Sequence, residues 1–144
     1  MARTIFVNLP VKDVAAATAF YTALGFDRDP RFSNEQASAM VWSDTISVMI
    51  LAQDFYRTFT TKRIADTHAT SAVLLCLSCD DRAAVDSMVE AAIAAGGREA
   101  RDPQDHGFMY SRAFEDLDGH VYEPMYMDLD AATAAFAAPE PAEA

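Results

Sequence analysis

The chain has 144 residues, of which 51% are hydrophobic and 10% aromatic, so it is long and apolar enough for one domain with a buried core. Its formal net charge of −11 would repel phosphate backbones and anionic lipid surfaces, which argues against nucleic-acid and membrane binding. No apolar run approaches the ~20 residues of a membrane span, and no signal-like stretch precedes the first strand. We therefore expect a soluble, cytoplasmic protein.

The first half of the chain, about residues 3–52, has the pattern of a strand, a helix and two further strands. The helix is predicted over residues 14–24, because Asp13 is a good N-cap and Gly25 is a natural residue to follow a helix end. The strands are predicted at residues 4–9, 38–42 and 45–51, with room for another short strand within residues 26–32.

The second half, about residues 71–128, repeats this order. A strand at residues 72–79 leads to the helix cap Asp80-Asp81, and the helix over residues 82–95 stops at Gly96-Gly97. An edge strand at residues 98–101 and a hairpin over residues 108–127 complete the unit.

A repeated βαβββ unit cannot bury its sheet face alone, so the two copies must pair. We therefore predict an α+β fold of two βαβββ units, whose curved mixed sheets surround a cup with the helices on the outside. A single domain is expected over residues 1–130. Residues 131–144 are rich in Ala, Pro and Glu and are expected to form a flexible tail, disordered beyond Ala138 after a short helix.

Glu123 is the residue of this hairpin that most needs an explanation. Strand alternation places it on one face with Val121 and Met125, as a carboxylate among apolar neighbours. Three roles remain open: pairing with Arg112 of the partner strand, anchoring a ligand or acting as a general base, and binding a metal.

Cys76 and Cys79 form a C-x-x-C pattern that also occurs in zinc and redox sites. They lie in an apolar run that is typical of a buried strand, where residues three apart point to opposite faces. We therefore expect two buried structural thiols that share neither a metal nor a disulfide.

Two motifs make the chain similar to a known superfamily. The first runs from Val11-x-Asp13 to Phe20-Tyr21-x-x-Leu24-Gly25-Phe26, and the second is Arg112-x-Phe114-x-Asp116-x-Asp118-Gly119-x-x-x-Glu123. Over roughly residues 3–128 the chain resembles the vicinal-oxygen-chelate superfamily of glyoxalases, bleomycin and fosfomycin resistance proteins and extradiol dioxygenases. This fold hosts several reactions and also plain drug binders, so the resemblance predicts the fold more strongly than the reaction.

The resemblance also implies where a metal would bind in the cup. The last-strand ligand corresponds to Glu123, whereas the other ligand positions fall on Phe6, on Leu74 and near Met49. Since one carboxylate does not hold a catalytic metal in a defined geometry, the metal site is expected to be degenerate. No cofactor is therefore predicted, and a divalent metal belongs to the alternative below.

Two functions remain open. The first is a binding protein that holds a small, partly apolar molecule in the cup. Arg112 would contribute to binding, and the cup would be lined by Phe6, Asn8, Met40, Trp42, Met49, Leu74, Cys76 and Glu123. The alternative is a divalent-metal-dependent glyoxalase-like lyase or extradiol-dioxygenase-like enzyme, in which Glu123 is a metal ligand or a base.

A homodimer is also expected, because superfamily members commonly pair their units across chains. The loop of residues 53–64 is long for a compact domain and carries Phe55, Tyr56 and Phe59. These side chains suit both a lid over an apolar ligand and an arm against a second subunit, and the sequence does not decide between the two.

Overall fold

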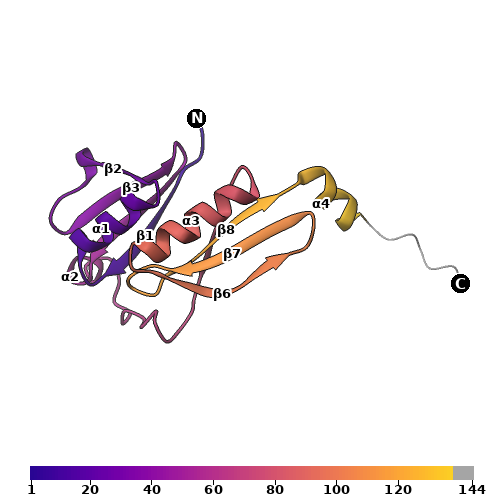
Figure 1. The fold of residues 1–144 in the computed structure, drawn as a ribbon. Helices are drawn as coiled ribbons and strands as arrows, with labels where there is room; N and C mark the ends of the chain where they lie inside the picture. Colours follow the sequence, from indigo (N-terminus) through magenta and orange to yellow (C-terminus); the bar gives the residue numbers. More distant parts are fainter. Residues whose placement is uncertain (138–144) are drawn as a thin grey trace, which may run out of the picture.

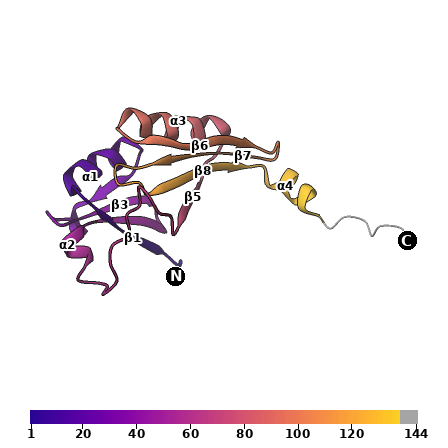
Figure 2. The same ribbon diagram turned by 90° about the horizontal axis from the view of Figure 1, so that it is seen from below.

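The computed structural model describes residues 1–137, which form two four-stranded sheets with the two long helices on one side (Figures 1 and 2). The first sheet has the order β1-β4-β3-β2, with β1 and β4 parallel and the other pairs antiparallel. Its elements are β1 (Ile5–Val11), α1 (Val14–Ala23), β2 (Asp27–Asp29), a 3-10 turn (Pro30–Phe32), β3 (Ala37–Ser43), β4 (Ile46–Ala52) and the short α2 (Gln53–Tyr56).

The second sheet repeats this arrangement with the order β5-β8-β7-β6, and β5 and β8 are its parallel pair. Its elements are β5 (Leu74–Ser78), α3 (Arg82–Ala94), β6 (Arg98–Asp105), β7 (Met109–Glu115) and β8 (Val121–Met127). The predicted α+β fold of two βαβββ units is therefore confirmed.

The C-terminal helix α4 (Leu129–Phe136) projects away from both sheets (Figure 1). It is the short helix expected at the start of the tail, and the disorder predicted beyond Ala138 concerns residues outside those described. Within residues 1–137, no helix is both long and apolar enough to cross a membrane.

Both long helices begin and end where the sequence predicts, to within one residue. Asp13 Oδ1 accepts a hydrogen bond of 3.0 Å from the backbone N–H of Ala16, and Asp81 Oδ1 accepts one of 2.7 Å from that of Ala84. Past the helix ends, Gly25 has a φ of 99° and Gly96 a φ of 105°, a conformation that glycine adopts without steric cost.

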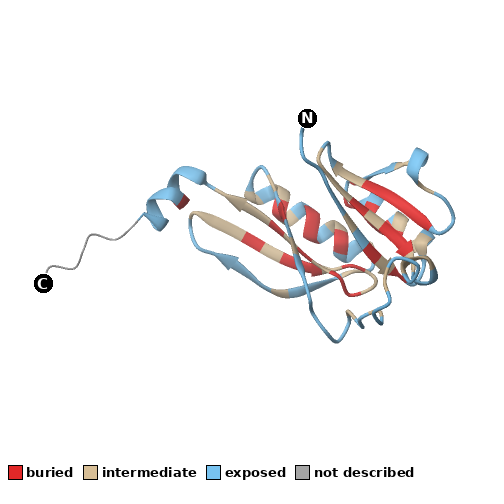
Figure 3. Ribbon diagram, turned by 180° about the vertical axis from the view of Figure 1, so that it is seen from behind, coloured by how far each residue is buried: buried red, intermediate tan, exposed pale blue. Residues whose placement is uncertain are grey.

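Each sheet has one face packed under a long helix and one open face without a covering helix, and Figure 3 marks the buried residues along the strands. The buried faces pack under α1 and α3 and form one core with residues of both units, including Met40, Ile50, Phe114 and Tyr122. The opposite faces carry exposed apolar side chains: Phe6 on β1 is 62% exposed and Leu74 on β5 is 55% exposed. In an isolated chain these open faces leave apolar area in water.

The two units are joined at the turn between β7 and β8. The backbone N–H of Lys12 donates to Asp118 Oδ1 at 2.8 Å, and Thr67 Oγ1 donates to the carbonyl of Asp118 at 2.5 Å. Thr67 lies in the linker of residues 57–73, so this hydrogen bond attaches the linker to the β7–β8 turn.

A bulge interrupts the pairing of β6 with β7. Glu99 pairs with Phe114, but Arg101, two residues further on, pairs with Ala113, so Ala100 is an extra residue on β6. The bulge moves Arg101 from the face that carries Glu99 to the opposite, open face.

Candidate functional site

Glu123 lies on the open face of the second sheet, as strand alternation predicts. In the parallel pair of β5 and β8 it is opposite Cys76, while Leu74 is opposite Val121 and Ser78 opposite Met125. Its side chain is 22% exposed, so its carboxylate is half-buried among mainly apolar neighbours.

The cation beside Glu123 is Arg101. Arg101 Nη2 donates to Glu123 Oε2 at 2.9 Å and to Ser111 Oγ at 3.1 Å. The arginine side chain is 27% exposed, so both charges of the pair are partly withdrawn from water. The sequence did not identify Arg101, because it was expected to end a regular edge strand rather than to follow a bulge.

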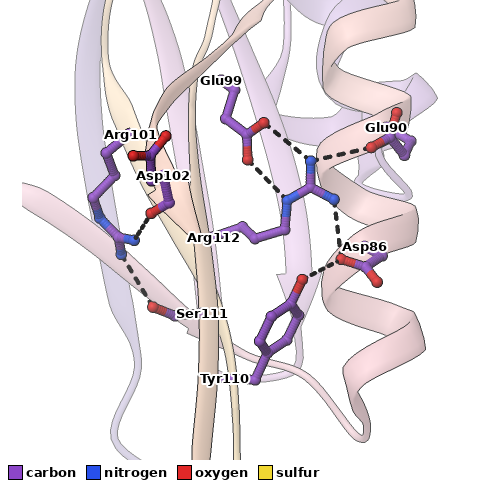
Figure 4. A network of polar contacts seen from close by, with 8 residues as sticks. All are labelled: Asp86, Glu90, Glu99, Arg101, Asp102, Tyr110, Ser111 and Arg112. Carbon is purple, nitrogen blue, oxygen red and sulfur yellow. Dashed lines mark hydrogen bonds and ion pairs between the residues drawn. The ribbon is translucent and has the colours of Figure 1, made fainter. Parts of the chain in front are cut away.

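Pairing with Arg112, one of the three roles left open for Glu123, does not occur, because Arg112 lies on the opposite face of β7. There it contacts the side chains of three acidic residues, from α3 and β6 (Figure 4): Asp86 at 3.0 Å, Glu90 at 3.1 Å and Glu99 at 2.9 Å. These hydrogen bonds raise the pKa of Arg112, that from Glu99 most. Arg112 therefore ties the helix to the sheet, away from the open face on which it was expected to bind ligand.

Phe6 and Met49 lie on the open face of the first sheet, as predicted, together with Ser47. They line a hollow of about 640 Å³ whose rim includes Arg31 and Phe32. Leu74, Cys76 and Glu123 are not among its lining residues. The predicted lining residues of the cup therefore lie on two separate open faces, and Asn8 borders a further cavity near β8.

Trp42 and Met40 were expected in the cup, and this expectation is wrong. The register of β3 with β4 pairs Ala39 with Met49, so Ala39 shares the open face, and Met40 points to the helix side. Met40 is fully buried, and the Trp42 ring packs against Phe26 with their centroids 4.8 Å apart.

Both cysteine thiols are free. Cys79 follows the end of β5 and is half-buried, whereas Cys76 is exposed, so the predicted burial of Cys76 is wrong. Desolvation, and then the neighbouring charge of Glu123, raises the pKa of the Cys76 thiol. The thiol therefore stays protonated near neutral pH and is a poor nucleophile.

The residues at the metal-ligand positions of the resemblance do not fit a divalent metal. Phe6 and Leu74 have no ligand atom, Met49 offers only a thioether, and the Glu123 carboxylate is paired with Arg101. Within residues 1–137, no group of three or more His, Cys, Asp or Glu side chains is arranged to hold a metal ion.

Comparison with known proteins places this geometry in context. Residues 3–40 match the family model described as bleomycin resistance protein-like N-terminal. No curated protein sequence gives a match to the chain.

Many solved structures are similar to the chain in fold. A glyoxalase/bleomycin resistance protein/dioxygenase family enzyme from Burkholderia phytofirmans is 21% identical with a TM-score of 0.72, covering 88% of this chain and 99% of its own. A glyoxalase-related enzyme from Fulvimarina pelagi is 16% identical with a TM-score of 0.73, and the match covers 88% of each chain. Lactoylglutathione lyase from Agrobacterium tumefaciens is 18% identical with a TM-score of 0.61, covering 90% of this chain and 96% of its own.

These likenesses in fold cover most of the chain, and the family model covers the motif at Val11. The chain therefore has the fold of the vicinal-oxygen-chelate superfamily.

Proposed function

We propose that this protein binds a small, partly apolar organic molecule against its open sheet faces, without a catalytic metal. The observation that carries this proposal is the residue set at the four ligand positions of the fold. Phe6, Leu74 and Met49 supply apolar contact where a metal enzyme would need oxygen or nitrogen ligands, and Glu123 is paired with Arg101. Apolar walls with a few placed polar groups are typical of small-molecule sites.

The Arg101–Glu123 pair is the polar anchor of this site. Ser111 Oγ holds Arg101 in place, so the pair presents both a donor and an acceptor at a fixed position on an otherwise apolar face. A ligand that carries an amide or an amine next to an aromatic ring would match these groups. The net charge of −11 would in addition attract cationic ligands.

We further propose that two copies of the chain complete the cup. Exposed apolar residues lie on or next to the edge strands β1 and β5, namely Ile5, Phe6, Val73 and Leu74. The hollow beside Phe6 lacks any wall from the second sheet of the same chain, and a second copy could supply one. Two free thiols suit a reducing compartment, which supports a cytoplasmic location.

The ligand is tested by calorimetric titration with metal-free bleomycin and a panel of small aromatic amines. Bleomycin is included because the matched family model is named after resistance to it. Glu123→Gln should weaken binding of any responding probe at least tenfold, about 1.4 kcal/mol. Glu35→Gln removes the same charge from an exposed loop and should change nothing. Equal affinity in the two variants would remove Glu123 from the site.

The metal and the assembly are tested separately. Elemental analysis of protein purified without chelator should give well under one equivalent of Fe, Ni, Zn or Mn per chain. One equivalent that Glu123→Gln abolishes would favour the alternative, a metal-dependent lyase or dioxygenase.

Sedimentation at micromolar concentration should give a dimer, and Phe6→Glu combined with Leu74→Glu should shift it to a monomer.

A further inference from the structure

A second cavity lies at the seam between the two units, and its lining includes the open-face residues Asn8 and Val121. It has a volume of about 380 Å³, within the usual range for small-molecule pockets. Its walls come from residues 7–10 of β1, from residues 65 and 67–73 of the linker, and from the start of β8. Apolar side chains such as Leu75 and Val121 provide much of the lining.

His120 is the polar residue that borders this cavity and is itself 92% buried, being only 8% exposed. Its backbone is held on both sides by Asp116: the N–H of His120 donates to Asp116 Oδ1, and its carbonyl accepts from the N–H of Asp116, each at 2.9 Å. Its ring nitrogen Nε2 lies 2.8 Å from the carbonyl oxygen of Pro10.

These contacts fix the tautomer of the ring. The Pro10 carbonyl can only accept, so Nε2 must carry the proton and donate it. In the neutral ring, Nδ1 then keeps an unshared electron pair. No residue among 1–137 donates to Nδ1, yet this nitrogen is not among the fully buried unpaired atoms of those residues, so it retains access to solvent.

His120 lines this cavity, and the cavity carries little net charge. Glu115, the carboxylate on its wall, is already paired with Arg98. A neutral ligand with one O–H or N–H donor would therefore satisfy Nδ1 without leaving a buried charge unpaired.

We propose that the seam cavity binds a small neutral molecule of the phenol type, whose hydroxyl donates to His120 Nδ1 and whose ring packs against Leu75. This site is independent of the function proposed for the open faces. Asn8 borders it, but Phe6, Met49, Leu74, Cys76 and Glu123 are not among its lining residues, so either proposal can fail while the other stands.

The first test uses phenol and anisole as matched probes on the full chain, followed by ¹H–¹⁵N NMR. The two probes are similar in size and apolar surface, but anisole cannot donate a hydrogen bond. The free protein should show the Nε2–H tautomer of His120. Phenol should shift the Nδ1 signal and the amides of Thr67 and Val121 with a saturable curve, and anisole should bind about three- to tenfold more weakly. Equal affinity for the two probes would overturn the role of Nδ1.

The second test uses two variants. His120→Gln keeps an N–H for the Pro10 carbonyl and removes the ring acceptor, so phenol should lose its advantage over anisole. Ala69→Trp places a large side chain at the cavity from the exposed linker and should abolish binding of both probes. This variant keeps the proposal testable if His120→Gln does not fold. Glu35→Gln, in an exposed loop, should leave phenol binding unchanged. Unaltered phenol binding in Ala69→Trp would contradict the assignment of the seam cavity as the phenol-binding site.

Discussion

Tyr21 of α1 donates a hydrogen bond of 2.6 Å from its hydroxyl to Asp116 Oδ2, and this buried contact joins the two units across 95 residues of sequence. Asp116 also accepts from the backbone N–H groups of Asp118 and His120, both at 2.9 Å. Desolvation nevertheless raises the pKa of Asp116, while the hydrogen bonds from the Tyr21 hydroxyl and from the backbone oppose that rise. The fold therefore depends on a satisfied polar contact inside its core.

Replacing Tyr21 with Phe should destabilise the protein by about 1–3 kcal/mol, because Asp116 loses one donor in a buried setting. The ring itself is kept, so its packing against Phe26 and Tyr122 should survive. Urea denaturation measures the change. Tyr126→Phe is the control, since the Tyr126 hydroxyl makes no hydrogen bond within residues 1–137, and it should stay within about 0.5 kcal/mol of the parent protein.

The partner of Glu123 can be identified with a double-mutant cycle. Glu123→Gln combined with Arg101→Met should show a coupling free energy of up to about 1 kcal/mol, since the pair is only partly buried. Glu123→Gln combined with Arg112→Met should be additive within about 0.3–0.5 kcal/mol, because the two residues lie on opposite faces. Coupling with Arg112 and none with Arg101 would contradict the register of β6.

Asp105 should titrate far below an ordinary aspartate. Hydrogen bonds from Arg82, and then from the Gly107 backbone, lower its pKa to about 2. Since this pKa is depressed in the folded protein, the stabilising contribution is present above the unfolded pKa of about 3.9 and is lost as the pH falls through about 2. Carboxyl NMR should show this midpoint, and Arg82→Met should return it toward about 3.9.

Asp29, in β2 of the first sheet, is an internal reference for this titration. Its pKa is also lowered, by the neighbouring Arg31. Its midpoint should not respond to Arg82→Met. A parallel shift of both carboxyl groups would mean that the substitution acts through the whole fold instead of through the Asp105 pair.

Gly119 and Gly107 provide a matched test of how closely the linker approaches the β7–β8 turn. Both have positive φ, 85° and 78°, so alanine should cost about 1–2 kcal/mol at either site. At Gly119 an added Cβ would also lie 2.7 Å from the backbone of Thr67, whereas at Gly107 it would meet nothing within 4 Å. Gly119→Ala should therefore lower the free energy of unfolding by roughly 1–3 kcal/mol more than Gly107→Ala does, as measured by thermal or urea denaturation. Equal losses would mean that the linker moves aside freely.

Local signals in the sequence predicted most of the fold. Helix boundaries followed from Asp13, Gly25 and Gly96, because caps and positive-φ glycines act within one turn of the chain. The position of Glu123 on the open face followed from alternation within a single strand. The two motifs then predicted the superfamily fold.

Relations between strands could not be read in the same way. Trp42 and Met40 were assigned to the wrong face, because the register of β3 against β4 depends on pairing rather than on residue type. Arg101 was missed as the partner of Glu123 for a similar reason, since the bulge at Ala100 has no signal in the sequence. The roles of Phe6, Asn8, Met49, Leu74 and Cys76 in ligand binding remain predictions.

The bulge in β6 also has an evolutionary consequence. Deleting Ala100 would restore regular pairing and leave Arg101 opposite Ala113 on the open face, so Glu123 would keep its cation. The bulge residue can therefore be lost without changing the charge of the open face. An ion pair at the last-strand carboxylate can accordingly persist in a chain of this fold that lacks the bulge.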